Sequence, residues 1–155
     1  MKKGGVNFVA SVPCLYLREL LDLINSDKEI THVPVTREEE GIGLCAGAYM
    51  GGMRPAIIMQ NSGLGNSINA LASLDLLYRI PVLMIISHRG VEGERIVAQM
   101  PMGKLTKHLL RTLGIPYVSP TLAEVESVVA VEAEKCFNER VPRAVLLSIS
   151  FWRGL

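Results

Sequence analysis

Thr36-Arg-Glu-Glu-Glu-Gly-Ile-Gly-Leu-Cys-Ala-Gly-Ala-Tyr49 is the stretch that decides how this chain is interpreted. Three adjacent carboxylates begin a predicted helix that then becomes small and apolar. Thr36 followed by Glu39 predicts a capping box, and acidic residues suit the first turn of a helix. Alternatively, one acid, for which Glu39 is our candidate, faces a ligand in an apolar pocket. Desolvation would then raise its pKa, while the helix N-terminus would oppose that rise.

Strand-like and helix-like segments alternate on both sides of this stretch. Strands are expected at 6–10, 29–35, 56–59, 81–86, 116–118 and 143–148. Helices are expected at 15–24, from 36, at 67–77, 104–113 and 121–138, with a glycine-rich loop at 60–66 and a long polar loop at 87–103. This alternation predicts an α/β fold, doubly wound, with a mostly parallel sheet and helices on both faces. The length predicts a single domain over residues 1–155.

Composition excludes several classes of function. A net charge of +1 gives no basic footprint for nucleic acid, and no apolar run reaches the length of a membrane span. Cys14, Cys45 and Cys136 are scattered without a CxxC or Cys/His cluster, so neither a zinc site nor a disulfide framework is indicated. We therefore expect no metal site in this chain and a reducing, cytoplasmic setting.

Four polar or turn segments follow predicted strands, at residues 11–14, 36–40, 60–66 and 87–90. In parallel sheets of this kind, ligands bind at the carboxyl ends of the strands. The sequence therefore predicts that these four segments lie on one rim of the domain and that the rim carries the site.

Two of these segments have an ordinary structural explanation as well as a functional one. Gly63 and Gly65 resemble the start of a dinucleotide fingerprint, but Ile68 replaces the third glycine, and a plain tight turn is the alternative. His88 and Arg89 come directly after or at the end of the most apolar strand and form a candidate anion site together with Arg95 and Lys104. The alternative is that the lone histidine is structural or faces solvent. No G-x-S-x-G motif supports a self-contained hydrolase.

The chain also resembles a known family through the acid helix and three further segments. These segments are Ala46-Gly-Ala-Tyr-Met-Gly-Gly52, Met59-Gln-Asn-Ser-Gly-Leu-Gly-Asn66 and Leu77-Tyr-Arg-Ile-Pro-Val-Leu-Met-Ile-Ile-Ser-His-Arg-Gly90. Over nearly its whole length, the chain resembles the pyrimidine-binding domain of thiamine-diphosphate decarboxylases. The similarity is greatest to the sulfopyruvate and phosphonopyruvate decarboxylase families.

The resemblance implies roles for individual residues. Counting back from Tyr49, the family's glutamate falls on Glu39, which would hydrogen-bond N1′ of the cofactor's aminopyrimidine and promote proton removal from C2. Glu38 and Glu40 are then assigned to the helix dipole and to solvent. The resemblance implies cofactor contacts at Gly63, Leu64, Gly65 and Asn66. Substrate contacts are expected at Pro13, Cys14, Gln60, Asn61, His88, Arg89 and Lys104.

The resemblance also implies a partner. The family's diphosphate-binding half carries Gly-Asp-Gly and a later Asn, and no Gly-Asp-Gly occurs here. A beta subunit would therefore bind the diphosphate and Mg²⁺, in a heteromeric complex with alpha–alpha contacts. The small residues after Glu39 would form the docking face. Only five residues precede the first expected strand, where the family usually has a helix.

The implied reaction converts 3-sulfopyruvate, a small 2-keto acid, to sulfoacetaldehyde and carbon dioxide, as in coenzyme M biosynthesis. Three alternatives stay open at this point. The subunit could act on phosphonopyruvate, it could be a non-catalytic binding or regulatory subunit of the same fold, or it could be a flavodoxin-like binding protein.

Overall fold

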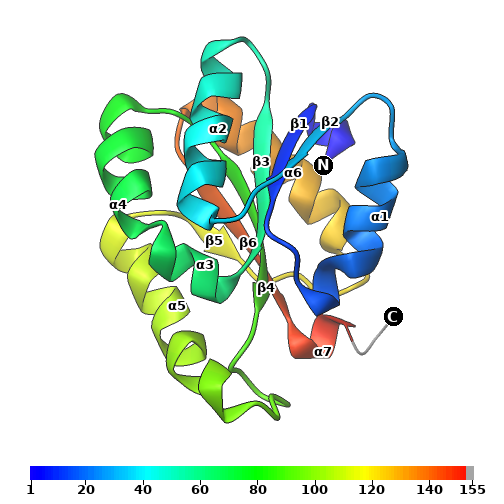
Figure 1. Cartoon of the computed structure of the whole chain (residues 1–155), viewed down its shortest axis with the longest axis vertical. Coiled ribbons are helices and arrows are strands. Elements are labelled where there is room, and N and C mark those ends of the chain that lie inside the picture. Colours follow the sequence, from blue (N-terminus) through cyan, green and yellow to red (C-terminus); the bar gives the residue numbers. More distant parts are fainter. Residues whose placement is uncertain (153–155) are drawn as a thin grey trace.

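A parallel sheet forms the middle layer of the protein, as shown by a computed structural model that describes residues 1–152 (Figure 1). Within these residues the sheet has six strands in the order β2-β1-β3-β4-β6-β5, and every neighbouring pair is parallel. The strands are β1 (Phe8–Ser11), β2 (Thr31–Pro34), β3 (Pro55–Gln60), β4 (Leu83–His88), β5 (Tyr117–Val118) and β6 (Arg143–Ser148). The predicted doubly wound α/β fold is confirmed.

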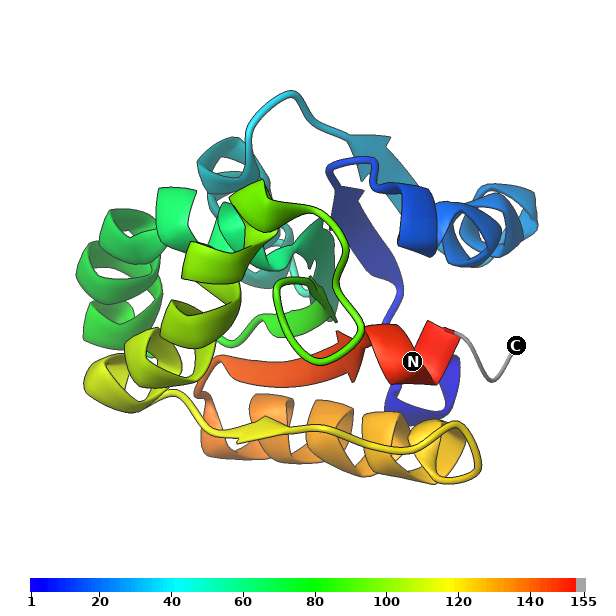
Figure 2. The same cartoon turned by 90° about the horizontal axis from the view of Figure 1, so that it is seen from below.

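Helices cover both faces of the sheet (Figures 1 and 2). On one face lie α1 (Arg18–Ser26) and α6 (Val125–Glu139), and on the other lie α2 (Glu38–Met50), α3 (Asn61–Asn66), α4 (Ile68–Ala70) and α5 (Met100–Leu113). The remaining helical elements are η1 (Lys2–Gly4), η2 (Leu15–Leu17), the π-helical η3 (Leu71–Leu76), η4 (Val97–Gln99) and α7 (Ile149–Trp152).

The central strands are apolar throughout because both of their faces are covered. Successive side chains of a strand point to opposite faces. Ile58 and Ile85 therefore pack toward α1 and α6, whereas Ile57 and Met84 pack toward α2 and α5. This explains why β3 and β4 are continuous apolar runs rather than alternating ones.

The predicted glycine-rich loop at 60–66 is wrong, because the chain enters α3 directly after β3. Gly63 has no positive φ and serves as a place of close approach rather than as a turn residue. The helix expected at 104–113 begins earlier, at Met100, and ends as predicted at Gly114, whose φ of 70° is left-handed.

The strand order reverses at β1, which lies between β2 and β3. Such a reversal opens a crevice at the carboxyl ends of the strands. The segments that leave β1 and β3 therefore begin at the expected ligand edge. Across residues 1–152, no helix combines the length and apolar character needed to cross a membrane.

Candidate functional site

Hydrogen bonds join the predicted rim segments to one another. The thiol of Cys14, after β1, donates to Oε1 of Gln60 at the end of β3 over 3.6 Å. Nδ2 of Asn61 donates to the backbone carbonyl of Arg89, after β4, over 3.0 Å. The prediction that segments far apart in the sequence share one rim is thus confirmed.

The helix cap at the start of α2 is made by Glu40. Its Oε2 accepts from the Thr36 hydroxyl at 2.9 Å and from the Arg37 backbone N–H at 3.3 Å. The predicted capping box of Thr36 with Glu39 is therefore wrong by one residue, because the first helical residue is Glu38 and the capping position N3 falls on Glu40.

Glu38 is buried, contrary to the expectation that it faces solvent. Only 8% of the residue is exposed, and Oε2 accepts a hydrogen bond from Nδ2 of Asn66 at 3.0 Å. This bond ties the start of α2 to the end of α3. Glu38 is a polar contact of the site that the sequence reasoning missed, and the run of three identical acids gave no signal for it.

Glu39 differs from both neighbours because one of its oxygens is buried without a hydrogen-bond partner among the described residues. Oε1 accepts from Nε of Arg37 at 2.5 Å, while Oε2 is shielded from solvent and lacks a hydrogen bond among the described residues. The nearby backbone N–H of Glu39 itself, followed by the Arg37 guanidinium, holds the pKa of Glu39 below its ordinary value. The arrangement presents an ionised acceptor at a helix N-terminus, which suits a ligand that donates a hydrogen bond.

The four predicted cofactor residues on α3 have different surroundings. Leu64 is fully buried in the core, and Gly63 lies against the Glu38 side chain. A Cβ at Gly65 would lie 3.1 Å from Cε of Met102. Asn66 is exposed, so it is the side chain of this group most accessible to a ligand.

Pro13, Cys14 and Gln60, for which the sequence predicts substrate contacts, lie along one edge of the rim, where the Cys14 thiol contacts Gln60. Pro13 and Cys14 line an open hollow of about 500 Å³ beside α1. Nε2 of Gln60 donates to Oγ of Ser62 and to Oε1 of Gln99, both at 2.9 Å. Gln99, which sequence reasoning missed, therefore joins this edge from the segment before α5.

The structure does not gather Asn61, His88, Arg89 and Lys104 into one exposed anion site. Asn61 is buried, and its Nδ2 bonds the Arg89 carbonyl and Oγ1 of Thr106. His88 is buried with Nε2 3.2 Å from the carbonyl oxygen of Gly103, and burial lowers its pKa. Lys104 is exposed, so it keeps the access that an anion would need.

The Arg89 guanidinium is occupied by Glu94, another residue that sequence reasoning missed. Nε and Nη2 of Arg89 donate to the two Glu94 oxygens at 2.6 and 2.8 Å. Both side chains are buried, at 8% and 2% exposure, and the guanidinium lies 4.7 Å from the Tyr16 ring centroid. Gly90 is required beside this pair because its φ is +75° and a Cβ would lie 2.0 Å from the Gln99 carbonyl oxygen.

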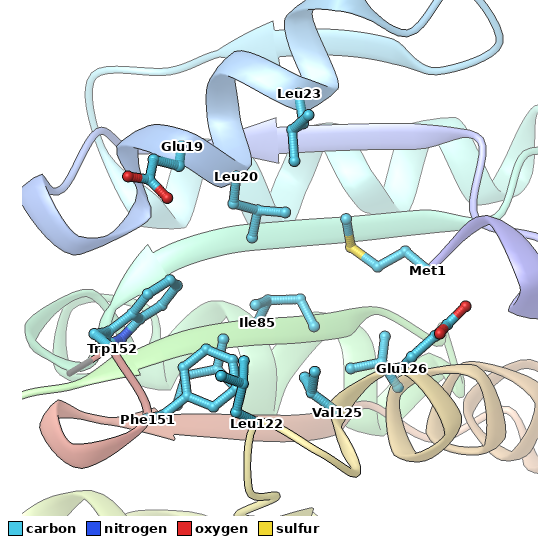
Figure 3. Close-up of a pocket in the computed structure, with 12 residues that line it drawn as sticks. Met1, Glu19, Leu20, Leu23, Ile85, Leu122, Val125, Glu126, Phe151 and Trp152 are labelled. Carbon is cyan, nitrogen blue, oxygen red and sulfur yellow. The ribbon is translucent and has the colours of Figure 1, made fainter. Parts of the chain in front are cut away.

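An apolar hollow of about 340 Å³ lies on the other face of the sheet (Figure 3). It opens between α1, α6 and α7, with Ile85 of β4 at its floor. Glu19 and Glu126 lie at opposite ends of the view, and Phe151 and Trp152 form one wall. None of the predicted site residues lines it, so it is separate from the rim.

The chain matches the family model for the thiamine pyrophosphate enzyme N-terminal TPP binding domain over residues 1–110. In solved structures, 2-oxoglutarate:ferredoxin oxidoreductase from Magnetococcus marinus shares the fold, with a TM-score of 0.74 and 14% identity. That match covers 97% of this chain and 27% of the other. The chain belongs to the thiamine pyrophosphate enzymes, as a domain of the N-terminal type.

Two curated relatives show to which group of thiamine pyrophosphate enzymes the chain is similar. The "Sulfopyruvate decarboxylase subunit alpha" of Methanococcus maripaludis is 55% identical, over 96% of this chain and 90% of that protein. The "Phosphonopyruvate decarboxylase" of Streptomyces viridochromogenes is 36% identical, over 92% of this chain but 37% of that protein. Within the thiamine pyrophosphate enzymes, the chain therefore belongs to the family of sulfopyruvate decarboxylase alpha subunits.

Proposed function

We propose that this chain is the alpha subunit of a decarboxylase that converts 3-sulfopyruvate to sulfoacetaldehyde and carbon dioxide. The single observation that carries the proposal is the Oε2 atom of Glu39, shielded and without a partner among the described residues. The nearly full-length similarity to an alpha subunit supports the choice of reaction.

Glu39 fits the role that a thiamine cofactor requires. A carboxylate with one oxygen held by Arg37 and the other without a partner can accept a hydrogen bond from the protonated ring nitrogen of an aminopyrimidine. Asn66, Gly63 and Gly65 would border the same ring from α3, with Leu64 anchoring that helix in the core. When bound, thiamine diphosphate supplies a nucleophilic carbon and takes up the electrons released as carbon dioxide leaves.

We assign to Glu39 the transfer of the proton at the cofactor's ring nitrogen. Its lowered pKa keeps it ionised in the free chain. When a partner covers the start of α2, loss of water raises the proton affinity of a carboxylate there. Glu39 would then be able to share a proton with the ring nitrogen, as a general acid–base group must near neutral pH.

A partner beta subunit would complete the site. Among residues 1–152, no group of three or more His, Cys, Asp or Glu is placed to hold a metal ion. We assign the diphosphate and Mg²⁺ to that partner, as expected from the absent Gly-Asp-Gly motif. The longer Streptomyces relative, of which this chain covers 37%, supports a second half carried elsewhere.

Part of the small-residue face of α2 is open for that partner. A Cβ at Gly43 or Gly47 would meet nothing within 4 Å, whereas one at Gly41 would lie 2.7 Å from Cδ1 of Ile57. Gly41 and Ala46 therefore serve packing on the sheet, and Gly43 and Gly47 face outward. We expect the partner, and alpha–alpha contacts, to use this outward side together with the exposed Leu44.

The substrate end of the site would use Pro13, Cys14 and Gln60 at the crevice, with Lys104 as the accessible cation. His88 and Arg89 would support this edge from the interior of the domain, since both are buried. The cysteines are all free thiols, which fits the cytoplasmic setting expected from the sequence.

Co-expression with a diphosphate-domain partner tests this proposal. Carbon dioxide release is measured from 3-sulfopyruvate and from phosphonopyruvate, with thiamine diphosphate and Mg²⁺ added or withheld. We expect release from sulfopyruvate, dependent on both additions. Preference for phosphonopyruvate would replace the substrate assignment, and a complex that binds the cofactor without turnover of either acid would identify a non-catalytic subunit.

A further inference from the structure

Glu38 occupies a position that the proposed reaction does not by itself explain. It is the first residue of α2, adjacent to Glu39, yet only 8% of it is exposed. A buried carboxylate is costly unless it is hydrogen-bonded. Glu40 already provides the helix cap, so capping does not explain why Glu38 is buried. The burial of Glu38 therefore indicates a specific contact with another part of the chain.

The contact is with α3, at two points one helical turn apart. Oε2 of Glu38 accepts from Nδ2 of Asn66 at 3.0 Å. A Cβ on Gly63 would lie 2.3 Å from Cγ of Glu38 and 2.6 Å from both Cδ and Oε1. Residues three apart lie on the same side of a helix. The Glu38 side chain thus rests on the backbone of α3 and holds the Asn66 amide from the same side.

This geometry couples the two parts of the proposed cofactor site. Glu39 follows Glu38 directly on α2, and Asn66 is the accessible polar side chain of α3. Without the Glu38 carboxylate, the Asn66 amide would lose its acceptor, and α3 would lose the side chain that sets its distance from α2. A displacement of about 1 Å at a reacting group is enough to lower turnover strongly.

We propose that Glu38 is a positioning residue, whose buried side chain fixes Asn66 and α3 against the start of α2 so that Glu39 and Asn66 face the cofactor together. This inference rests on the proposed function for its catalytic consequence. The contact itself is independent of that function, and so can be tested separately.

The first test uses the full chain without turnover. Thermal unfolding is followed for Glu38→Ala, Asn66→Ala and the double variant. If the two side chains bond one another, the losses in melting temperature overlap, and the double variant loses clearly less than the sum. Losses that simply add would overturn the contact.

A steric test examines the second point of contact. Gly63→Ala alone should lower the melting temperature, because the new Cβ meets the Glu38 side chain. In the Glu38→Ala background the three atoms nearest to that Cβ are gone. Gly63→Ala should therefore cost less there than in the wild-type chain. An equal cost in both backgrounds would refute the close packing of Glu38 on Gly63.

The kinetic test uses the reconstituted complex with sulfopyruvate. We expect Glu38→Ala to lower kcat about 10- to 100-fold, the range for loss of a hydrogen bond to a charged group, with little change in KM. Glu38→Gln keeps an acceptor oxygen for Asn66 and should recover most of that loss. Glu134→Ala, which removes an exposed acid on α6, is the matched control.

The outcomes separate the two proposals. If the wild-type complex releases no carbon dioxide from either keto acid, the proposed function fails, while the unfolding tests still decide the contact. If the wild-type complex is active and Glu38→Ala matches the Glu134→Ala control, the positioning role is refuted. The same conclusion follows if Glu38→Gln, folded as judged by its melting curve, is no more active than Glu38→Ala.

Discussion

At the start of α2, the carboxylate of Glu39 has one oxygen held by Arg37 and the other without a partner among the described residues. In the segment that follows β4, the carboxylate of Glu94 accepts five hydrogen bonds, from the Arg89 guanidinium and from three backbone N–H groups. We call these two regions the α2 corner and the 89–96 loop.

The difference between the two regions follows from how each charge is satisfied. In the 89–96 loop, the opposite charge and the backbone donors come from the same short segment, so the Glu94 carboxylate is satisfied by hydrogen bonds within the loop. In the α2 corner, a carboxylate oxygen has no hydrogen-bond donor among the described residues, and the outward glycine face has no neighbouring atoms packed against it. Internally satisfied charges stabilise a fold, and an acceptor without a partner at a rim is a candidate for binding and chemistry.

The strongest test of the α2 corner is Glu39→Gln in the reconstituted complex. Because Gln cannot share a proton as a carboxylate does, we expect carbon dioxide release from sulfopyruvate to fall roughly 10²- to 10⁴-fold. Its melting temperature should stay close to that of the wild type, since Glu40 makes the cap. Glu40→Gln, which keeps an acceptor for the cap, serves as the control. Near-normal turnover by Glu39→Gln would show that the Glu39 carboxylate has no catalytic role, and the α2 corner would then not differ from the 89–96 loop in function.

Breaking the 89–96 loop should affect stability instead. Glu94→Gln leaves the buried Arg89 charge without its counter-ion, a change that costs about 3 kcal/mol in such pairs. Hydrogen exchange should accelerate at the backbone N–H groups of Gly90, Arg95 and Ile96, which Glu94 now binds. Glu92→Gln, an exposed acid in the same loop, is the control. Unchanged protection in Glu94→Gln would show that the loop does not depend on the pair.

The pH dependence of the pair has a definite sign. The Arg89 guanidinium holds the pKa of Glu94 well below its ordinary value. A folded-state pKa that is depressed contributes stability above the ordinary carboxyl range and loses it as the pH falls. Acidification should therefore open the wild-type loop, and Glu94→Gln should make its exchange rates less dependent on acid.

Asp75 sharpens the comparison, because it is a carboxylate without partners in the core rather than on the rim. It is fully buried on η3, and neither oxygen has a hydrogen bond among the described residues. Burial raises the pKa of Asp75 from 3.8 to about 7. The folded chain binds this proton more tightly than the unfolded chain does, so the contribution of Asp75 to stability is most favourable below pH 3.8 and declines as the pH rises toward 7.

Asp75→Asn should therefore stabilise the chain above pH 7 by about 2 kcal/mol and flatten its stability between pH 4 and 7. The rise in pKa from 3.8 to about 7 corresponds to about 4 kcal/mol, at about 1.4 kcal/mol for each pKa unit, and burial of the Asn amide without hydrogen-bond partners offsets part of it. The measurement is denaturant unfolding at several pH values. Asp22→Asn, an exposed acid on α1, is the matched control. A loss of stability at pH 8 would indicate that the Asp75 charge is satisfied in the folded protein.

The smallest expected effect concerns the glycine face of the α2 corner. Replacing Gly43 or Gly47 by Ala removes backbone entropy from the unfolded chain and should stabilise the isolated chain by about 0.5–1 kcal/mol. The same methyl group should weaken association with the partner if that face is the docking surface. Gly41→Ala is the control, because its Cβ would meet Ile57 and should destabilise the chain. Stabilisation without any loss of association would place the partner elsewhere.

Much of this fold could be predicted from the sequence, for reasons visible in particular elements. Apolar runs such as β4 and β6 and the helical spacing of Leu17, Leu21 and Ile24 are local signals, because burial of one helix face or both strand faces fixes the pattern. Alternation of these elements then limits the topology to a parallel sheet. The rim follows, since all strands end at the same edge.

The sequence alone therefore determined the α/β architecture and the edge of the sheet at which the rim segments meet, where we propose the site. Only the tertiary structure decided that Glu40 caps the helix, that Glu38 is buried against Asn66, and that Glu39 keeps a shielded oxygen without a partner among the described residues. Successive helical residues point about 100° apart, so three identical carboxylates enter three different environments. Residue type does not reveal those environments, because segments distant in the sequence, brought together by folding, create them.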